Sequence, residues 1–119
     1  NPEASIKALE AYDKPLILIA GGRNKGSDFS LLAKKIKQKA KVLIVLGECA
    51  EELAEAACKA GCDLVLKVED LPAAVKAAHK VAVPGDIVLL SPACASWDMF
   101  ANYEERGDCF KEAVLKLGR

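Results

Sequence analysis

Four short apolar runs, none with the in-out alternation of a half-exposed strand, constrain the fold of this chain most strongly. They are rich in Val, Ile and Leu and cover Leu16–Ala20, Val42–Leu46, Leu64–Val68 and Ile87–Leu90. Apolar runs of this length without alternation are typical of strands that are buried on both faces. A sheet buried on both faces needs helices on each side, so the runs predict a layered α/β domain.

Between these runs, apolar residues recur at helical spacing and give each segment a single apolar face. The three stripes are Phe29, Leu32 and Ile36; then Leu53, Ala56, Ala57 and Ala60; then Leu71, Val75, Ala78 and Ala82. Strands alternating with helices over short links imply right-handed crossovers and parallel pairing. We therefore predict a doubly wound α/β fold with a mainly parallel sheet, a Rossmann-like three-layer sandwich.

Residues at the ends of the stripes agree with these boundaries. Ser27 and Asp28 can cap the first of the three helices, and Gly61 can end the second. Asp70 can cap the third helix, where Pro72 suits the first turn. Residues 83–86, Val-Pro-Gly-Asp, are expected to turn the chain into the fourth strand.

The length of 119 residues favours one domain, because two would each be too small for a comfortable core. Residues 1–13 are expected to be a short helix that leads in from a preceding domain. A stripe of Phe110, Val114 and Leu117 predicts a C-terminal helix that docks on the sheet.

Charge and cysteine content exclude several classes of function. Seventeen basic and seventeen acidic residues give no net charge, which disfavours nucleic acid as a partner. No apolar run is long enough to cross a membrane, and no signal peptide is visible, so a cytoplasmic location is expected. The five cysteines include no CxxC pair and have no nearby histidine, so we expect free thiols and no metal site.

Ligands of open parallel sheets gather beyond the carboxyl ends of the strands, which directs attention to the loops after the first and fourth strands. The first loop, residues 21–29, combines two glycines, the cation Lys25 and a helix N-terminus, which together favour an anion. Its spacing fits neither GxGxxG nor GxxxxGK[ST], so a dinucleotide or P-loop site is disfavoured.

The second loop belongs to the segment 89–107, which starts at the end of the fourth strand and mixes hydroxyls, a thiol and aromatic residues. Ser91 and Ser96 can donate hydrogen bonds to a carboxylate, and neither has a nearby histidine that would make it a nucleophile. Trp97, Phe100 and Tyr103 recur at three-residue spacing, on one side of a helical turn. The chain is therefore expected to bind an anion at this edge and to hold no catalytic residue of its own.

Together the two loops resemble those of the Mur ligases, and most closely the C-terminal domain of the members that add D-glutamate. The matching residues are Gly21-Gly22-x-x-Lys25-x-x-Asp28-Phe29 and Leu90-Ser91-Pro92-Ala93-x-Ala95-Ser96-x-Asp98-x-Phe100-x-Asn102-Tyr103-x-x-Arg106-Gly107. The resemblance covers essentially the whole chain.

The resemblance implies part of a three-domain cytoplasmic ligase of peptidoglycan synthesis. Such an enzyme joins D-glutamate to UDP-N-acetylmuramoyl-L-alanine, using ATP and Mg²⁺ to form an acyl phosphate that the amine attacks. The family pattern implies that Lys25 binds one carboxylate of D-glutamate and that Ser96, with the backbone of Trp97, holds the other. Tyr103 would pack against the ligand. Trp97 and Tyr103 stand where the family commonly has leucine and phenylalanine.

The parts of such a ligase that bind UDP, ATP and Mg²⁺ have no counterpart in this sequence, so the chain alone is expected to be inactive. Two other functions stay open. The chain could be a free-standing small-anion-binding or receiver-like module, although Asp63 precedes its strand instead of ending it. It could also be a dinucleotide-binding domain in which Glu48 holds a ribose, although the glycine fingerprint is missing.

Overall fold

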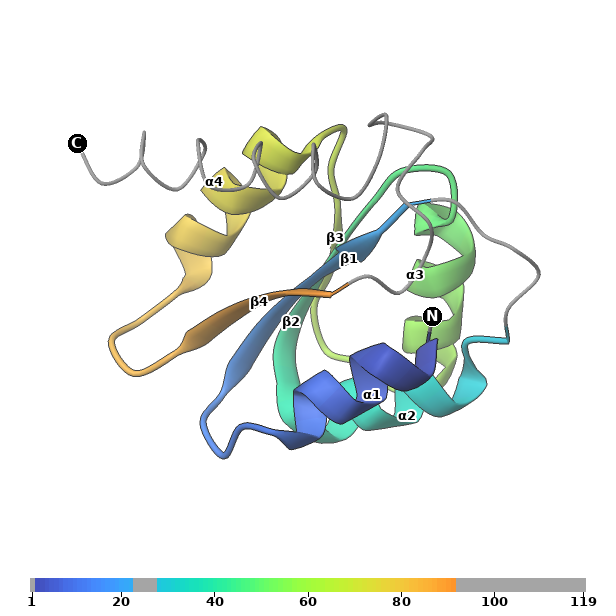
Figure 1. The fold of residues 1–119 in the computed structure, drawn as a ribbon. Helices are drawn as coiled ribbons and strands as arrows, with labels where there is room; N and C mark the ends of the chain where they lie inside the picture. Colours follow the sequence, from blue (N-terminus) through green and yellow to red (C-terminus); the bar gives the residue numbers. More distant parts are fainter. Residues whose placement is uncertain (1, 23–27, 92–119) are drawn as a thin grey trace.

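The computed structural model describes residues 2–22 and 28–91, which form helices alternating with strands (Figure 1). The elements are α1 (Pro2–Glu10), β1 (Leu16–Gly21), α2 (Ser30–Lys39), β2 (Ala40–Leu46), α3 (Ala50–Lys59), β3 (Val65–Lys67), α4 (Leu71–Val81) and β4 (Ile87–Ser91). All four predicted strands are confirmed, although β3 is shorter than its apolar run. The predicted stripe at Phe110, Val114 and Leu117 lies outside the described residues.

The four strands form one parallel sheet in the order β3-β2-β1-β4. The chain adds β2 and β3 on one side of β1, and after β3 it returns through α4 to add β4 on the other side. This reversal makes the sheet doubly wound, as the alternation of runs and stripes predicts. The central strand β1 is therefore flanked by neighbours on both sides.

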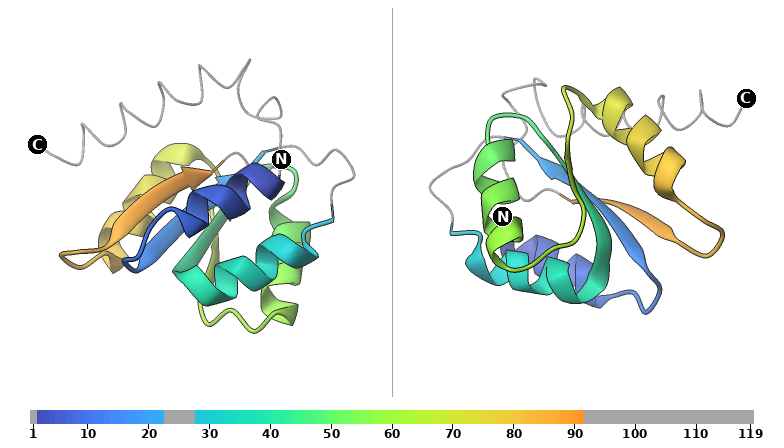
Figure 2. Two further views of the ribbon diagram at one scale, coloured as in Figure 1. Left: turned by 60° about the horizontal axis from the view of Figure 1, so that its bottom comes forward. Right: turned by 180° about the vertical axis from the view of Figure 1, so that it is seen from behind.

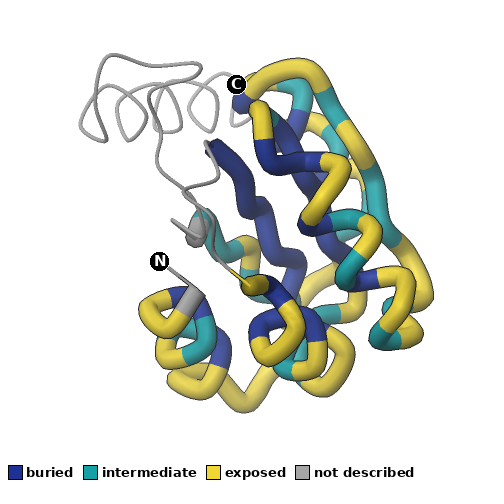
Figure 3. The backbone as a smooth tube through the Cα atoms, turned by 90° about the vertical axis from the view of Figure 1, so that its right-hand side faces the viewer, coloured by how far each residue is buried: buried dark blue, intermediate teal, exposed yellow. Residues whose placement is uncertain are grey.

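Helices cover both faces of the sheet: α1, α2 and α3 lie on one face and α4 lies on the other (Figure 2). Alternate residues of β1 supply the two cores. Leu16 and Leu18 pack with the three-helix layer, whereas Ile17 and Ile19 pack against α4. Every residue of β1 is buried (Figure 3), which explains why its sequence is apolar without alternation.

The predicted signals at the ends of α3 and α4 are confirmed. Gly61 has φ +91° and ends α3 in a Schellman motif. In this motif the Cys62 N–H donates to the Ala57 carbonyl, and the Gly61 N–H donates to the Cys58 carbonyl, both at 3.0 Å. Asp70 caps α4 by accepting a 2.8 Å bond from the Ala73 N–H.

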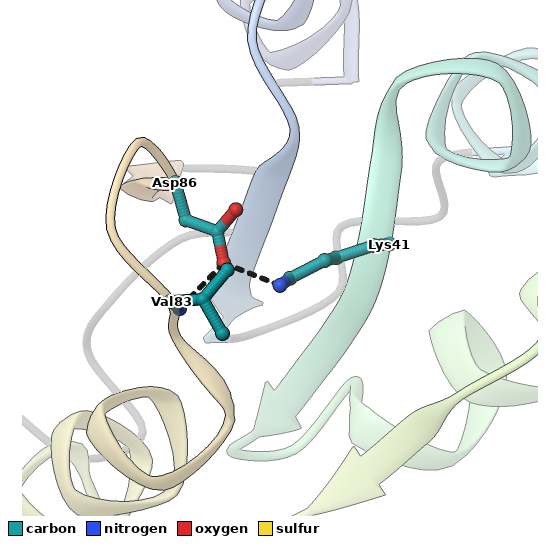
Figure 4. Close-up of polar contacts among 3 residues, drawn as sticks. All are labelled: Lys41, Val83 and Asp86. Carbon is teal, nitrogen blue, oxygen red and sulfur yellow. Dashed lines mark hydrogen bonds and ion pairs between the residues drawn. The ribbon is translucent and has the colours of Figure 1, made fainter.

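The turn that leads into β4 is fastened to the amino end of β2 through Asp86 (Figure 4). Its carboxylate accepts the Val83 N–H at 2.9 Å and pairs with the Lys41 ammonium. The β1–β2 register skips Lys41, since Leu16 is paired with Ala40 and Ile17 with Val42. A bulge of this kind can redirect a side chain, and here Lys41 reaches past β1 to a carboxylate that is only 4% exposed.

Helix α1 is part of the core. Leu9 is fully buried in the three-helix layer, and Ser5 is also buried. A 3.0 Å ion pair between Glu10 and Lys35 ties the end of α1 to α2. The short N-terminal helix is thus confirmed, while its role as a lead-in from a preceding domain stays a prediction.

The prediction of free thiols is correct for Cys58 and Cys62 and wrong for Cys49. Cys58 and Cys62 are free, whereas Cys49, which is fully buried at the start of α3, is disulfide-bonded. The prediction from the sequence rested on the expected cytoplasmic location and on the absence of a CxxC pair. Neither observation indicates which buried cysteine has a disulfide partner. Within residues 2–22 and 28–91, no helix has the length and apolar character needed to cross a membrane.

Candidate functional site

The sheet order places side by side the two strand ends from which the loops singled out by the sequence start. β1 and β4 are parallel neighbours, and Ala20 near the end of β1 is paired with Ser91 at the end of β4. The connection from β1 runs through α2 to β2 on one side of it, whereas the connection from β3 runs through α4 to β4 on the other side, so the strand order reverses between β1 and β4. Such a switch point is where open α/β sheets bind their ligands.

The four residues expected to contact a ligand, Lys25, Ser96, Trp97 and Tyr103, lie outside the described residues. Their individual roles therefore stay predictions. The described residues show how both ends of the first loop and the start of the second loop are attached to the sheet and helices.

Two glycines fix the direction in which the first loop leaves β1. A Cβ atom on Gly21 would lie 2.1 Å from the Leu46 carbonyl oxygen, so no larger residue fits there. Gly22 has φ +115°, a conformation that favours glycine. Its N–H donates to the Leu46 carbonyl at 3.3 Å, and its carbonyl accepts the Cys49 N–H at 2.9 Å. The loop therefore starts from a point fastened to the β2–α3 connection.

The other end of the first loop is fastened at the start of α2. Asp28 accepts hydrogen bonds from the Ser30 N–H at 2.8 Å and the Ser30 hydroxyl at 2.6 Å. The hydroxyl bond and then the amide bond lower the pKa of Asp28 below its usual value. Phe29, only 5% exposed, anchors the same turn in the three-helix core. The N-cap of α2 is Phe29, which makes no side-chain capping bond, so the expected cap at Asp28 is wrong by one residue, although Asp28 does bind the first residue of the helix. Ser27 lies outside the described residues.

A charged pair that sequence reasoning missed lies at the carboxyl end of β3. The Lys67 ammonium donates to the Glu51 carboxylate at 2.6 Å, linking the end of β3 to the first turn of α3. The hydrogen bond and the charge of Lys67 lower the pKa of Glu51. The two residues are 16 positions apart and exposed, so only the fold reveals their pairing. Because Glu51 offsets its charge, Lys67 is a poor candidate for binding an anionic ligand.

Neither a metal group nor a hollow is found among the described residues at the β1–β4 switch point. Among residues 2–22 and 28–91, no group of three His, Cys, Asp or Glu side chains is arranged to hold a metal. A hollow of about 340 Å³ lies at the opposite, amino edge of the sheet, where its lining includes Lys14, Lys39 and Lys41. It is separated from the β1–β4 switch point by the length of the strands.

Comparisons with known proteins agree on one family. The family model for the glutamate ligase domain of Mur ligases matches residues 1–94. A UDP-N-acetylmuramoylalanine–D-glutamate ligase of Pelotomaculum thermopropionicum is 62% identical over 98% of this chain. The same-named ligase of Desulfitobacterium hafniense strain Y51 is 52% identical, and that of Clostridioides difficile strain 630 is 47% identical, each over 98% of the chain.

The chain spans 26% of the length of each of these relatives. The fold is also found in a solved domain from a Haemophilus ducreyi protein described as a putative UDP-N-acetylmuramate:L-alanyl-gamma-D-glutamyl-meso-diaminopimelate ligase. That domain is 13% identical, with a TM-score of 0.60 over 95% of this chain and 84% of the solved one. At this identity the likeness concerns the fold alone.

Proposed function

Because the chain belongs to the Mur ligase family, we propose that it is the D-glutamate-binding C-terminal domain of a UDP-N-acetylmuramoylalanine–D-glutamate ligase. The observation that carries the proposal is the 62% identity to a ligase of that name over nearly the whole chain. The shared quarter of the relatives includes both loops at the β1–β4 switch point.

We propose that the ligand binds across the ends of β1 and β4. The first loop would present Lys25 to one carboxylate of D-glutamate, since its two ends are held by Gly22 and Asp28. The second loop starts one strand away and would present the Ser96 hydroxyl and the Trp97 backbone to the other carboxylate, with Tyr103 packing alongside. Two anionic groups on one small molecule match two polar loops on neighbouring strands.

ATP and Mg²⁺ belong, in this proposal, to other parts of a longer ligase. The sequence has no GxxxxGK[ST] motif, and residues 2–22 and 28–91 contain no three-ligand metal group, which supports this assignment. When bound elsewhere in the enzyme, ATP would activate the carboxylate of UDP-N-acetylmuramoyl-L-alanine. The task of this domain would be to hold D-glutamate with its amine free to attack that carboxylate.

An NMR titration of the 119-residue chain tests the binding site. D-glutamate should shift amides next to the two loops, including those of Gly22, Asp28 and Ser91. The expected dissociation constant is about 1 mM or weaker, because two strongly hydrated carboxylates gain only a few charge-assisted hydrogen bonds. Lys25→Ala should abolish the shifts while leaving the rest of the spectrum intact. Shifts confined to the amino edge, or equal shifts in Lys25→Ala, would contradict the site.

A chimeric enzyme tests the function itself. Replacing the matching quarter of the Pelotomaculum ligase with this chain should preserve phosphate release from ATP that depends on D-glutamate and on UDP-N-acetylmuramoyl-L-alanine. Lys25→Ala in the chimera should raise the KM for D-glutamate, and Lys7→Ala on the exposed face of α1 is the matched control. A folded chimera with no D-glutamate-dependent turnover would refute the proposed function.

A further inference from the structure

The disulfide at Cys49 joins the β2–α3 connection to the segment that follows β4. Of the five cysteines in the sequence, Cys49 is disulfide-bonded, whereas Cys58 and Cys62 are free. This leaves two cysteines as the partner of Cys49, namely Cys94 and Cys109, which both lie outside the described residues. Either of them comes after β4 in the chain, in or just beyond the second loop of the candidate site.

The backbone of Cys49 is fixed beside the start of the first loop. Its N–H donates to the Gly22 carbonyl at 2.9 Å, and its carbonyl accepts the Leu53 N–H at 3.0 Å, since Cys49 is the N-cap residue of α3. The residue is also fully buried in the three-helix core. Cys49 is therefore held just beyond the carboxyl end of β1, the strand that pairs with β4.

The sheet register brings the end of β4 within reach of Cys49. Ala20 in β1 is paired with Ser91, the last residue of β4. Neighbouring strands are about 4.8 Å apart, and Cys49 is hydrogen-bonded to the extension of β1, so it lies about 10 Å from the line of β4. Three residues span up to about 10 Å, and the Cα atoms of a disulfide are themselves about 4.4–6.8 Å apart. Cys94, which follows Ser91 by three positions, can therefore reach Cys49 without any change in the sheet.

We propose that Cys49 and Cys94 form a reversible disulfide that couples D-glutamate binding to the thiol–disulfide balance of the surroundings. Cys94 is favoured over Cys109 because closing a shorter loop from the end of β4 costs less entropy. The inference rests on the proposed function, in which the second loop contributes Ser96, two positions after Cys94.

The reaction is thiol–disulfide exchange with a low-molecular-weight disulfide such as oxidised glutathione. One protein thiolate attacks this disulfide, which gives a mixed disulfide and releases one glutathione thiolate. The other protein thiolate then attacks the mixed disulfide and releases the second glutathione. The protein thiols lose two protons and two electrons, and one oxidised glutathione becomes two reduced molecules. An excess of reduced thiol reverses both steps.

The disulfide would tie the second loop to the same residue that holds the first. Cys49 binds the start of the first loop through the Gly22 carbonyl, and its sulfur would hold the second loop at Cys94. Loops that are already ordered lose less conformational entropy when a ligand binds. We therefore expect the oxidised chain to bind D-glutamate about three- to tenfold more tightly than the reduced chain.

Peptide mapping tests the pairing. The 119-residue chain is equilibrated with oxidised glutathione, its free thiols are alkylated in denaturant, and it is digested with trypsin. Cleavage after lysine and arginine separates the two candidates, because Cys94 and Cys109 fall in different peptides, residues 81–106 and residues 107–111. We expect the peptide of residues 42–59, which contains Cys49, to be linked to residues 81–106. A link to residues 107–111, or no link, would overturn the proposal.

An NMR titration of D-glutamate into the oxidised and reduced chains tests the coupling. The difference in affinity should vanish in Cys94→Ser, which leaves the buried Cys49 in place. It should persist in Cys109→Ser, the matched control that also removes one thiol. A circular-dichroism spectrum of each variant confirms that the fold persists. Equal affinities in the two states of the unmodified chain would overturn the coupling.

Trp97 emission separates a failure of this inference from a failure of the proposed function. Trp97 follows Cys94 by three positions, so its emission should differ between the oxidised and reduced chains without any ligand, and this difference should be lost in Cys94→Ser. If D-glutamate binds neither state while the emission differs as expected, the proposed function is contradicted and the disulfide is supported. The same emission in both states would overturn the disulfide itself.

Discussion

At the scale of single residues, the close approach of Gly21 to the neighbouring strand is a tighter steric constraint than those at Gly61 and Gly85. A Cβ atom there would meet backbone oxygen at 2.1 Å, and backbone cannot rotate away as a side chain can. Gly85 is a useful contrast because it has φ +96° and no atom within 4 Å of the place where a Cβ would stand. Glycine is required at position 21 because a Cβ atom would clash, whereas at position 85 it is favoured by the positive φ.

We therefore expect Gly21→Ala to destabilise the chain by roughly 3 kcal/mol or more, as overpacking that must move backbone does. Gly85→Ala should cost about 1 kcal/mol, the price of a left-handed conformation for a residue with a Cβ. Urea unfolding of the two variants and the unmodified chain measures both values. Equal losses in the two variants would show that β1 and β2 can separate more easily than their geometry indicates.

Asp86 gives the fold a dependence on pH. The Lys41 hydrogen bond, then the Val83 N–H, lower the pKa of Asp86 below its usual 3.8. A group whose pKa is lowered by folding stabilises the fold above its unfolded pKa, and that stability is lost as the pH falls through the folded pKa. The unmodified chain should therefore lose stability as the pH is lowered from about 5 toward 3.

Asp86→Asn should be less stable than the unmodified chain at pH 7 and should show a shallower decline on acidification. Asp63→Asn is the matched control, because Asp63 is 90% exposed and 3.8 Å from its lysine, and its decline should follow that of the unmodified chain. Thermal melting at several pH values makes the comparison. A decline in Asp86→Asn as steep as that of the unmodified chain would mean that other carboxylates carry the dependence.

At the scale of elements, α1 belongs to the core that α2 and α3 also form. Leu9 is fully buried there, whereas Lys7 on the same helix is exposed. Leu9→Ala should cost about 2–5 kcal/mol, as leucine truncation in a packed core does. Lys7→Ala should change stability by no more than about 0.5 kcal/mol. Chemical denaturation compares the two, and a small loss in Leu9→Ala would indicate that α1 is only loosely attached.

The elements themselves could be predicted because their signals are local. β1 has no polar residue, and Asp70 and Gly61 mark helix ends by bonds within a few positions. The bulge at Lys41 and its reach to Asp86 could not be predicted, since both depend on which strands become neighbours. The same holds for Glu51 with Lys67 and for the disulfide at Cys49. The loop positions of the candidate site followed from strand order, but its side-chain geometry did not.

At the scale of the whole molecule, the strand order joins early and late parts of the described chain through pairing of β1 with β4. β4, the last described strand, pairs with β1, the first, along five positions from Leu16 to Ala20. β1 also pairs with β2 on its other side, so it cannot leave the sheet without exposing both cores. No cut in the sequence separates this sheet into two independent parts, which favours a single cooperative unit.

We therefore propose that residues 1–119 unfold as one domain, and the only tryptophan gives a direct test. Far-ultraviolet circular dichroism follows the secondary structure of the whole chain, including α1–α4 and β1–β4, whereas Trp97 fluorescence follows the second loop of the candidate site. If the segment after β4 belongs to the same unit, urea should produce coincident transitions with one slope, roughly 1–3 kcal/mol/M for a domain of this size. Tyr12→Phe, a change at an exposed position, should leave both curves unchanged. A fluorescence transition at a lower urea concentration than the dichroism transition would show that the second loop unfolds separately. A site built across the ends of β1 and β4 would then lose one of its two loops while the sheet is still folded.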